Sequence, residues 1–346
     1  MTATAATSAP AAPAARAASA SSTLAGAITA GLREAMRRDD SVILMGEDIG
    51  PLGGVFRVTA GLQDEFGADR VRDTPLAESG IVGTAIGLAM GGYRPVVEIQ
   101  FDGFVFPAFD QITTQLAKMH YRSEGDVQVP VVIRIPYGGG IGAIEHHSES
   151  PEAYFAHTAG LRVVSPATPA DAFTMIQQAI ASPDPVIFLE PKARYWSKGP
   201  LPEAPVELDD ADALQHARTV RAGKDVTLAG FGPTVASLLA AAEVAAQDGV
   251  SAEVIDLRSI SPLDVETVAA SVRRTGRLVI AHEAPTAYGI GGELAARVSE
   301  ECFYSLQAPV LRVGGFHTPY PANAHEHEYL PGVDRIIDAI ARTIEE

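Results

Sequence analysis

The sequence predicts an α/β protein built from two doubly wound domains, each formed around a parallel sheet. Helical hydrophobic patterns alternate with short β-branched runs, which is typical of crossover units on a parallel sheet. The alternation stops at a proline-rich segment and then resumes, which indicates a boundary between two domains. The length of 346 residues also suits two domains, because a domain usually has about 100 to 200 residues.

The first domain is predicted over residues 22–197. Ahead of it, residues 1–21 consist almost entirely of Ala, Ser, Thr and Pro, so we expect a disordered tail. A mitochondrial transit peptide is the alternative, although such a peptide should carry several arginines and this tail has only Arg16. The domain begins with a helix over 23–38. Its expected strands are 41–45, 95–100, 130–135 and 185–189, and its further helices are 79–92, 106–120 and 169–182.

A linker over residues 198–224 separates the two domains. Its first part, 198–213, carries three prolines and many carboxylates without an apolar period. The second domain, 225–346, repeats the alternation on a smaller scale. Its expected strands are 225–229, 252–256, 277–281 and 309–312, and its expected helices are 233–248, 262–274, 291–304 and 333–345.

Charge and composition exclude several classes of protein. A formal net charge of -17 opposes binding to nucleic acid and to anionic membranes, because Lys and Arg dominate both kinds of contact. The longest uncharged apolar stretch, 79–93, has 15 residues, whereas a membrane span takes about 20. Cys302 is the only cysteine and cannot form an intramolecular disulfide. We therefore expect a bacterial cytoplasmic protein, with the mitochondrial matrix as the alternative.

Glu78 is the first candidate for catalysis. No other charge lies between Glu78 and Arg94, and the helix that begins after Glu78 is apolar on every side, so it should be buried. A first-turn acid favoured by the helix dipole is the plain interpretation. Burial favours a functional role, because buried carboxylates concentrate at functional sites.

The second candidate is the segment Glu145-His146-His147-Ser148-Glu149-Ser150. It follows a predicted strand and the glycine-rich loop 138–142, and strand ends of parallel sheets carry ligand sites. A polar surface loop is the simplest interpretation, and acid–base chemistry by one histidine is the main alternative. Zinc is disfavoured, because adjacent histidines point in different directions and no second ligand cluster accompanies them.

Four further features have plain structural interpretations. We expect His325-Glu326-His327 to be a solvated surface loop, and Tyr288 to Glu293 to be a tightly packed helix start that lacks full dinucleotide-fingerprint spacing. Cys302 should be a small buried apolar side chain. The last feature is a set of residues expected in the core, although a flat cofactor ring would suit the same surface: Phe101, Phe104, Phe106, Phe109 and Met119.

Several motifs, in order along 22–346, carry a family resemblance: Met45-Gly46-Glu47-Asp48, Gly53-Gly54-Val55-Phe56, Asp73 to Gly80, Gly91 to Pro95, Phe106 to Ile112, and His147-Ser148. They resemble the beta subunits of the thiamine-diphosphate-dependent dehydrogenase component of 2-oxo acid dehydrogenase complexes. The resemblance implies a transketolase-like pyrimidine-binding domain over 22–197 and a transketolase C-terminal-like domain over 225–346.

The resemblance also implies roles for four residues. Glu78 matches the glutamate that hydrogen-bonds a ring nitrogen of the cofactor's aminopyrimidine and so promotes loss of the thiazolium proton. Leu76 and Phe104 match residues that pack around the pyrimidine. His147 matches the histidine of substrate handling and of reductive acylation of the lipoyl group.

Partners follow from the resemblance as well. The chain lacks Gly-Asp-Gly followed by paired asparagines, the motif that binds diphosphate and Mg²⁺ in thiamine enzymes. An alpha subunit would supply it, in a heterotetramer of two alpha and two beta chains. The second domain would then make beta–beta contacts. It would also dock the small basic subunit-binding domain of the dihydrolipoyl acyltransferase core, whose lipoyl domain accepts the acyl group.

Some relatives hold an alkali-metal ion such as K⁺ with backbone carbonyls. The matching carbonyls here are those of Ala179, Ile180 and Asp184. Ser182 stands where the relatives' pattern has a carboxylate, which weakens this prediction.

The segment Ser148 to His157 looks more like branched-chain enzymes than pyruvate enzymes. We therefore expect 3-methyl-2-oxobutanoate dehydrogenase activity, with pyruvate dehydrogenase as the alternative.

Two other classes of function stay open. One is a catalytically silent docking subunit, which the joint retention of Glu78, Phe104 and His147 disfavours. The other is metal-dependent hydrolysis through His146, His147 or the loop 325–327, which predicts bound zinc.

Overall fold

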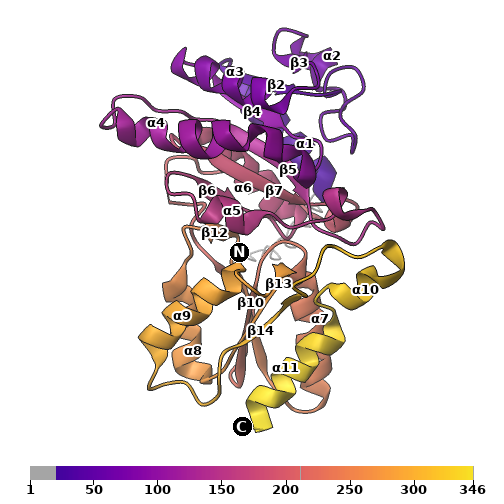
Figure 1. The fold of residues 1–346 in the computed structure, drawn as a ribbon, viewed down its shortest axis with the longest axis vertical. Helices are drawn as coiled ribbons and strands as arrows, with labels where there is room; N and C mark the ends of the chain where they lie inside the picture. The colour runs from indigo at the N-terminus through magenta and orange to yellow at the C-terminus, as the bar shows by residue number, and fades with distance from the viewer. Residues whose placement is uncertain (1–20, 211, 346) are drawn as a thin grey trace, which may run out of the picture.

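The computed structural model describes residues 21–210 and 212–345, which form two stacked α/β domains (Figure 1). The predicted tail therefore lies outside the described residues, apart from Ser21. This residue belongs to strand β1 (Ser21–Thr23), which pairs antiparallel with β8 (Lys198–Pro200). The expected fold class, two doubly wound and mostly parallel sheets, is confirmed.

The first domain contains a seven-stranded sheet in the order β12-β6-β7-β5-β4-β2-β3. The strands are β2 (Val42–Gly46), β3 (Val71–Asp73), β4 (Arg94–Glu98), β5 (Val132–Tyr137), β6 (Arg162–Val164), β7 (Val186–Pro191) and β12 (Ser259–Ser261). All pairings are parallel except that of β12 with β6. The four predicted strands are present. The missed strands have three residues each, too few to show a period, and β12 comes from the second half of the chain.

Helices cover both faces of this sheet. Helices α1 (Leu24–Arg38) and α6 (Pro169–Ala181) pack against each other, and α3 (Glu78–Met90) packs against β4. Short helices α2 (Leu62–Phe66) and α5 (Glu152–Ala156) complete the domain.

The predicted helix 106–120 is helical throughout, but it is not one regular α-helix. It is a 3₁₀ helix (η1, Asp102–Ala108), a π-helical segment (Gln111–Leu116) and α4 (Ala117–Arg122). Pro107 lies inside η1 and cannot donate a backbone hydrogen bond there.

The second domain has a five-stranded sheet in the order β14-β13-β10-β11-β9. Its strands are β9 (Arg218–Arg221), β10 (Val226–Gly230), β11 (Ala252–Asp256), β13 (Leu278–Pro285) and β14 (Leu311–Gly315). Its helices are α7 (Thr234–Gln247), α8 (Val265–Thr275), α9 (Ile290–Cys302), α10 (Glu326–Tyr329) and α11 (Val333–Glu345). The expected linker 198–224 needs correction, because it contains β8 and also β9, which pairs antiparallel with β11. The prolines between these two short strands concealed them.

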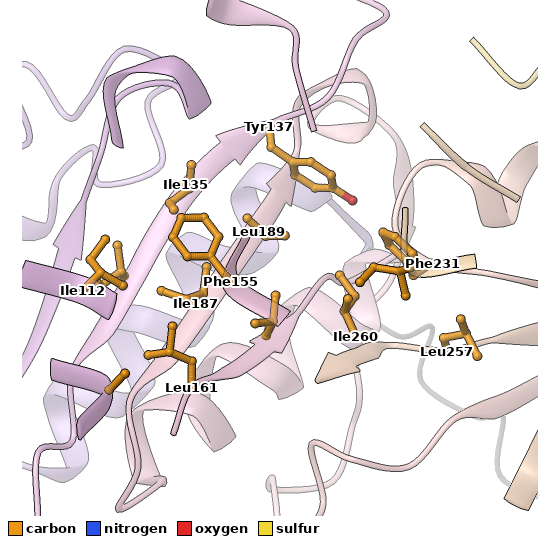
Figure 2. Close-up of a cluster of buried hydrophobic side chains, with 14 of the residues drawn as sticks. Ile112, Ile135, Tyr137, Phe155, Leu161, Ile187, Leu189, Phe231, Leu257 and Ile260 are labelled. Carbon is orange, nitrogen blue, oxygen red and sulfur yellow. The ribbon is translucent and has the colours of Figure 1, made fainter. Parts of the chain in front are cut away.

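A single hydrophobic cluster joins the two domains (Figure 2). Ile135 and Leu189 come from the first sheet, whereas Phe231, Leu257 and Ile260 come from the second half of the chain. The C-terminal domain therefore lies directly against the end of the first sheet. None of the helices in the described part of the chain is long and apolar enough to cross a membrane.

Candidate active site

Acidic side chains gather where the central strands of the first sheet end. Glu47 follows β2 directly, and Glu98 is the last residue of β4. Because these strands are parallel neighbours, their carboxyl ends meet at one edge of the sheet, where ligands bind in open α/β folds. Glu78 is the first residue of α3, and its carboxylate lies close enough to Glu47 to interact with it electrostatically.

Glu78 and Glu47 form a pair of buried carboxylates. Glu78 is only 9% exposed, so the burial predicted from the apolar helix is confirmed. Glu47 is also buried, and its pKa is raised by burial first and then by the negative charge of Glu78. The neighbouring negative charge disfavours ionisation of Glu47, so Glu47 keeps its proton more readily than a solvated glutamate does. Glu47 was not predicted as a site residue; its signal is an acid placed directly after a strand.

Leu76 lies two residues before Glu78 and is 82% exposed. An apolar side chain this exposed beside a buried carboxylate suits a surface that a ligand or a partner chain covers. The adjoining helix α3 packs against η1, the element that carries Phe104.

Phe104 and His147 lie together in an aromatic cluster. The ring centroid of His147 is 5.2 Å from that of Phe104 and 4.2 Å from that of Phe101, and Phe56 also contacts Phe101. The backbone of η1 approaches the histidine segment closely, because a Cβ at Gly103 would overlap the carbonyl oxygen of His146. The structure therefore brings together two of the predicted site residues, and the helix of the third packs alongside.

His147 is held as a neutral imidazole. Its pKa is lowered mainly by burial and then by the neighbouring His146. Its Nδ1 atom is buried and has no hydrogen-bond partner within 21–210 and 212–345. A neutral imidazole carries one unprotonated ring nitrogen, which can accept a proton or a hydrogen bond.

A buried ion pair supports this cluster from below. Lys192 Nζ lies 2.6 Å from Asp102 Oδ1, and both side chains are almost completely buried. Asp102 Oδ2 accepts a hydrogen bond from the backbone N–H of Glu149, at 3.0 Å. Lys192 also lies over the ring of Phe101, which contacts His147. The ion pair thus ties the end of β7 to both η1 and the histidine segment.

Two of the three carbonyls expected to hold an alkali ion, those of Ile180 and Asp184, already accept hydrogen bonds. Ile180 O accepts from Arg94 Nη1 at 2.7 Å, and Asp184 O accepts from Ser182 Oγ at 3.0 Å. The ion stays a prediction. Among the described side chains, no group of three or more His, Cys, Asp and Glu is placed to hold a metal ion.

The remaining sequence candidates have mixed outcomes. Cys302 is buried as expected. The loop 325–327 is not wholly solvated, because Glu326 is buried between its exposed neighbours His325 and His327. Phe106 is 44% exposed, so it is wrong as a core residue.

Glu152 gives a testable pH dependence. It is completely buried, neither carboxyl oxygen has a partner among the described residues, and burial raises its pKa to about 8 from an unfolded value of 4.5. Between pH 4.5 and about 8 the unfolded chain loses this proton and the folded chain keeps it. The free energy of unfolding therefore falls as the pH rises through this range. We expect Glu152→Gln to raise the free energy of unfolding at pH 8 by on the order of 2 kcal/mol, with little change at pH 4.5.

Urea unfolding of both chains at pH 4.5 and pH 8 checks this expectation. Glu203→Gln, at an exposed position, is the control and should shift neither midpoint. An equal effect of Glu152→Gln at both pH values would show that Glu152 does not titrate in this window.

Comparison with known proteins explains this arrangement. Residues 21–197 match the model of the transketolase pyrimidine-binding domain, and 215–336 match that of the transketolase C-terminal domain. The chain is 61% identical to a pyruvate dehydrogenase E1 component subunit beta of Leifsonia xyli, over 92% of this chain and 93% of the relative. It is 53% identical to a 3-methyl-2-oxobutanoate dehydrogenase subunit beta of Mycobacterium tuberculosis, over 93% and 92%. The chain belongs to the 2-oxo acid dehydrogenase beta subunits.

Beta subunits of 2-oxo acid dehydrogenases are thiamine-diphosphate-dependent transketolase-like proteins that work with an alpha subunit. A 2-oxoisovalerate dehydrogenase subunit beta of Pseudomonas aeruginosa is 45% identical, over 93% of this chain and 95% of the relative. A solved split-gene transketolase, described as an inactive beta4 tetramer, shares the fold at a TM-score of 0.71 and 21% identity, covering 93% of this chain and 98% of that one. The family resemblance inferred from the motifs is thus confirmed.

Proposed function

We propose that this beta subunit, with an alpha subunit, catalyses thiamine-diphosphate-dependent oxidative decarboxylation of a branched-chain 2-oxo acid and reductive acylation of a lipoyl group. The observation that carries the proposal is the buried pair of Glu47 and Glu78, which lies at the same sheet edge as the cluster that holds a neutral His147.

The residues present fit the pyrimidine end of the cofactor. Glu47 Oε1 is buried without a partner in the described chain, and the exposed Leu76 and the ring of Phe104 offer apolar contacts for a flat heterocycle. When bound, thiamine diphosphate supplies the electron sink for decarboxylation. Glu78 would hydrogen-bond a ring nitrogen of the bound pyrimidine and exchange a proton with it, and Glu47 lies beside Glu78 at this sheet edge.

His147 acts on the substrate side. When the acyl group passes to the lipoyl disulfide, the neutral ring would take up the proton that the hydroxyl on the acyl carbon loses, and it would supply a proton to the departing sulfur. Phe101, Phe104 and the buried Lys192–Asp102 pair hold the ring in place and exclude water.

The proposal also covers how the subunits assemble. The alpha subunit holds the diphosphate and Mg²⁺, and two alpha and two beta chains form a heterotetramer in the bacterial cytoplasm. The net charge of -17 supports docking of a basic subunit-binding domain from the acyltransferase core, whose lipoyl domain then reaches the site. Binding of K⁺ would compete with Arg94, which already donates a hydrogen bond to the carbonyl of Ile180.

The substrate is the finer question. The segment Ser148 to His157 supports the branched-chain type, whereas a pyruvate-type relative has the higher identity of 61% against 53%. Pyruvate is therefore the second candidate. Glu152 and Tyr154 belong to this segment, and Tyr154 contacts the rings of Phe106 and Phe109.

Co-purification with the alpha subunit from the neighbouring gene, followed by assays with thiamine diphosphate and Mg²⁺, tests both parts. We expect a stable complex with a kcat/KM at least about tenfold higher for 3-methyl-2-oxobutanoate than for pyruvate, because a pocket discriminates roughly 10- to 200-fold per methylene. The reverse preference would establish the pyruvate type. Absence of decarboxylation of either acid would refute the proposed function.

A further inference from the structure

The segment that carries His147 is a closed loop. Its ends meet where the backbone N–H of Gly138 donates to Glu149 O, at 2.9 Å. The N–H of Glu149 in turn donates to Asp102, so the far end of the loop is anchored in the first domain. The near end, Gly138 to Gly142, contains four glycines and needs other contacts to take one conformation.

Those contacts come from the second domain. Glu283, in β13, accepts a hydrogen bond from the N–H of Gly139 at 2.9 Å. Glu326, the first residue of α10, accepts from Gly140 at Oε1 (2.9 Å) and from Gly142 at Oε2 (3.1 Å). The buried Glu326 and the partly buried Glu283 thus accept hydrogen bonds from three backbone N–H groups of the glycine loop across the domain boundary.

The loop is shaped to receive them. Gly140 and Gly142 have φ of +84° and +71°, which other residues rarely adopt. A Cβ at Gly139 would overlap the hydroxyl of Tyr320, and this hydroxyl donates to Glu326 Oε1 at 2.8 Å. The close approach, the backbone conformation and the carboxylates form one contact that a freely solvated loop would not need.

We infer that Glu326 and Glu283 are positioning residues: they hold the glycine loop and thereby fix the place of His147 for acyl transfer. This inference rests on the proposed function. The C-terminal domain then has a role at the active site in addition to assembly. Without the two carboxylates, the glycines give the loop many conformations, and displacement of a catalytic group by about 1 Å can cost up to 100-fold in rate.

The test uses the complete alpha–beta assembly with the variant Glu326→Gln. Glutamine has the same size as glutamate, but one carboxylate oxygen becomes an NH₂ group that cannot accept a hydrogen bond, and the other becomes a weaker acceptor. We expect acyl transfer to a free lipoyl domain to fall about tenfold, because the loop is displaced. Decarboxylation measured with an artificial electron acceptor should stay within about twofold, because Glu78 is untouched. Amide hydrogen exchange of the peptides covering 138–147 should quicken.

Two matched variants sharpen this test. Glu328→Gln lies in the same helix, where the side chain is exposed and pairs only with His325 among the described contacts, and it should behave as wild type. Tyr320→Phe keeps the carboxylate and both backbone contacts, so it should retain most of the acyl transfer. If Glu326→Gln fails to fold, Glu283→Gln weakens the single contact to Gly139 and should show the same split to a smaller degree.

The inference is overturned if exchange in 138–147 is unchanged, if exchange quickens while acyl transfer is unchanged, or if both activities fall together. Failure of the proposed function is a separate outcome, since it would appear as no decarboxylation by the wild-type assembly. The exchange measurement still tests whether the two carboxylates hold the loop in that case.

Discussion

Replacement of Glu78 by glutamine should lower the decarboxylation rate of the assembled enzyme by roughly 100- to 10,000-fold, the usual contribution of a positioned acid or base. Glutamine keeps the size of the side chain but cannot exchange a proton with a ring nitrogen. Glu78 is 9% exposed at the start of α3, and the variant replaces one of two neighbouring buried carboxyl groups by an amide of the same size. The assembly should therefore still form, and the measurement is CO₂ release by the purified alpha–beta complex.

The matched control is Glu293→Gln. Glu293 is also a first-turn acid, in α9, but it is exposed. If Glu78 acted only through the helix dipole, the two variants would have similar small effects, about 0.3 to 1 kcal/mol on stability. Wild-type turnover of Glu78→Gln would remove this residue from the mechanism.

Replacement of His147 by glutamine should separate the two half-reactions. We expect reductive acylation of a lipoyl domain to fall about 100-fold or more, because general acid–base groups contribute at least that much. Decarboxylation with an artificial electron acceptor should fall much less, because the proton exchange assigned to Glu78 remains. Single-turnover acylation of the lipoyl domain, followed by mass spectrometry, measures the first step directly.

His157→Gln is the control for this variant, because His157 is exposed and lies near the end of α5. It should leave both half-reactions unchanged. Equal losses of both activities in His147→Gln would indicate a general structural role for the ring instead of a role in acyl transfer.

The sequence predicted the longer elements and missed those whose pairing depends on distant segments. The apolar run after Glu78 predicted α3 and its burial correctly, because a helix without a polar face must be covered. Strand β12 has three residues and pairs with β6, almost 100 residues earlier, so no local pattern could indicate it. The segment expected as one helix over 106–120 is helical throughout, but it changes between 3₁₀, π and α geometry, which its apolar pattern did not indicate.

The site shows the same division. The motifs predict Glu78, Phe104 and His147 as site residues, and the structure places Phe104 against His147. The supporting contacts were not predicted: Lys192 meets Asp102 from 90 positions away, and Glu326 reaches the glycine loop from the other domain. Such pairs depend on the tertiary fold, because a buried charge is stable only where the chain brings its partner. Glu47 lay within a recognised motif, but its pairing with Glu78 became visible only in three dimensions.

The central claim is that this chain supplies the proton-exchanging carboxylate of a thiamine diphosphate site that an alpha subunit completes. The most direct measurement is CO₂ release from a 2-oxo acid, with thiamine diphosphate, Mg²⁺ and an artificial electron acceptor, by each chain alone and by both together. We predict release only when both chains are present, and its loss when the beta chain carries Glu78→Gln. Release by the beta chain alone, or undiminished release by the assembled Glu78→Gln variant, would contradict the claim.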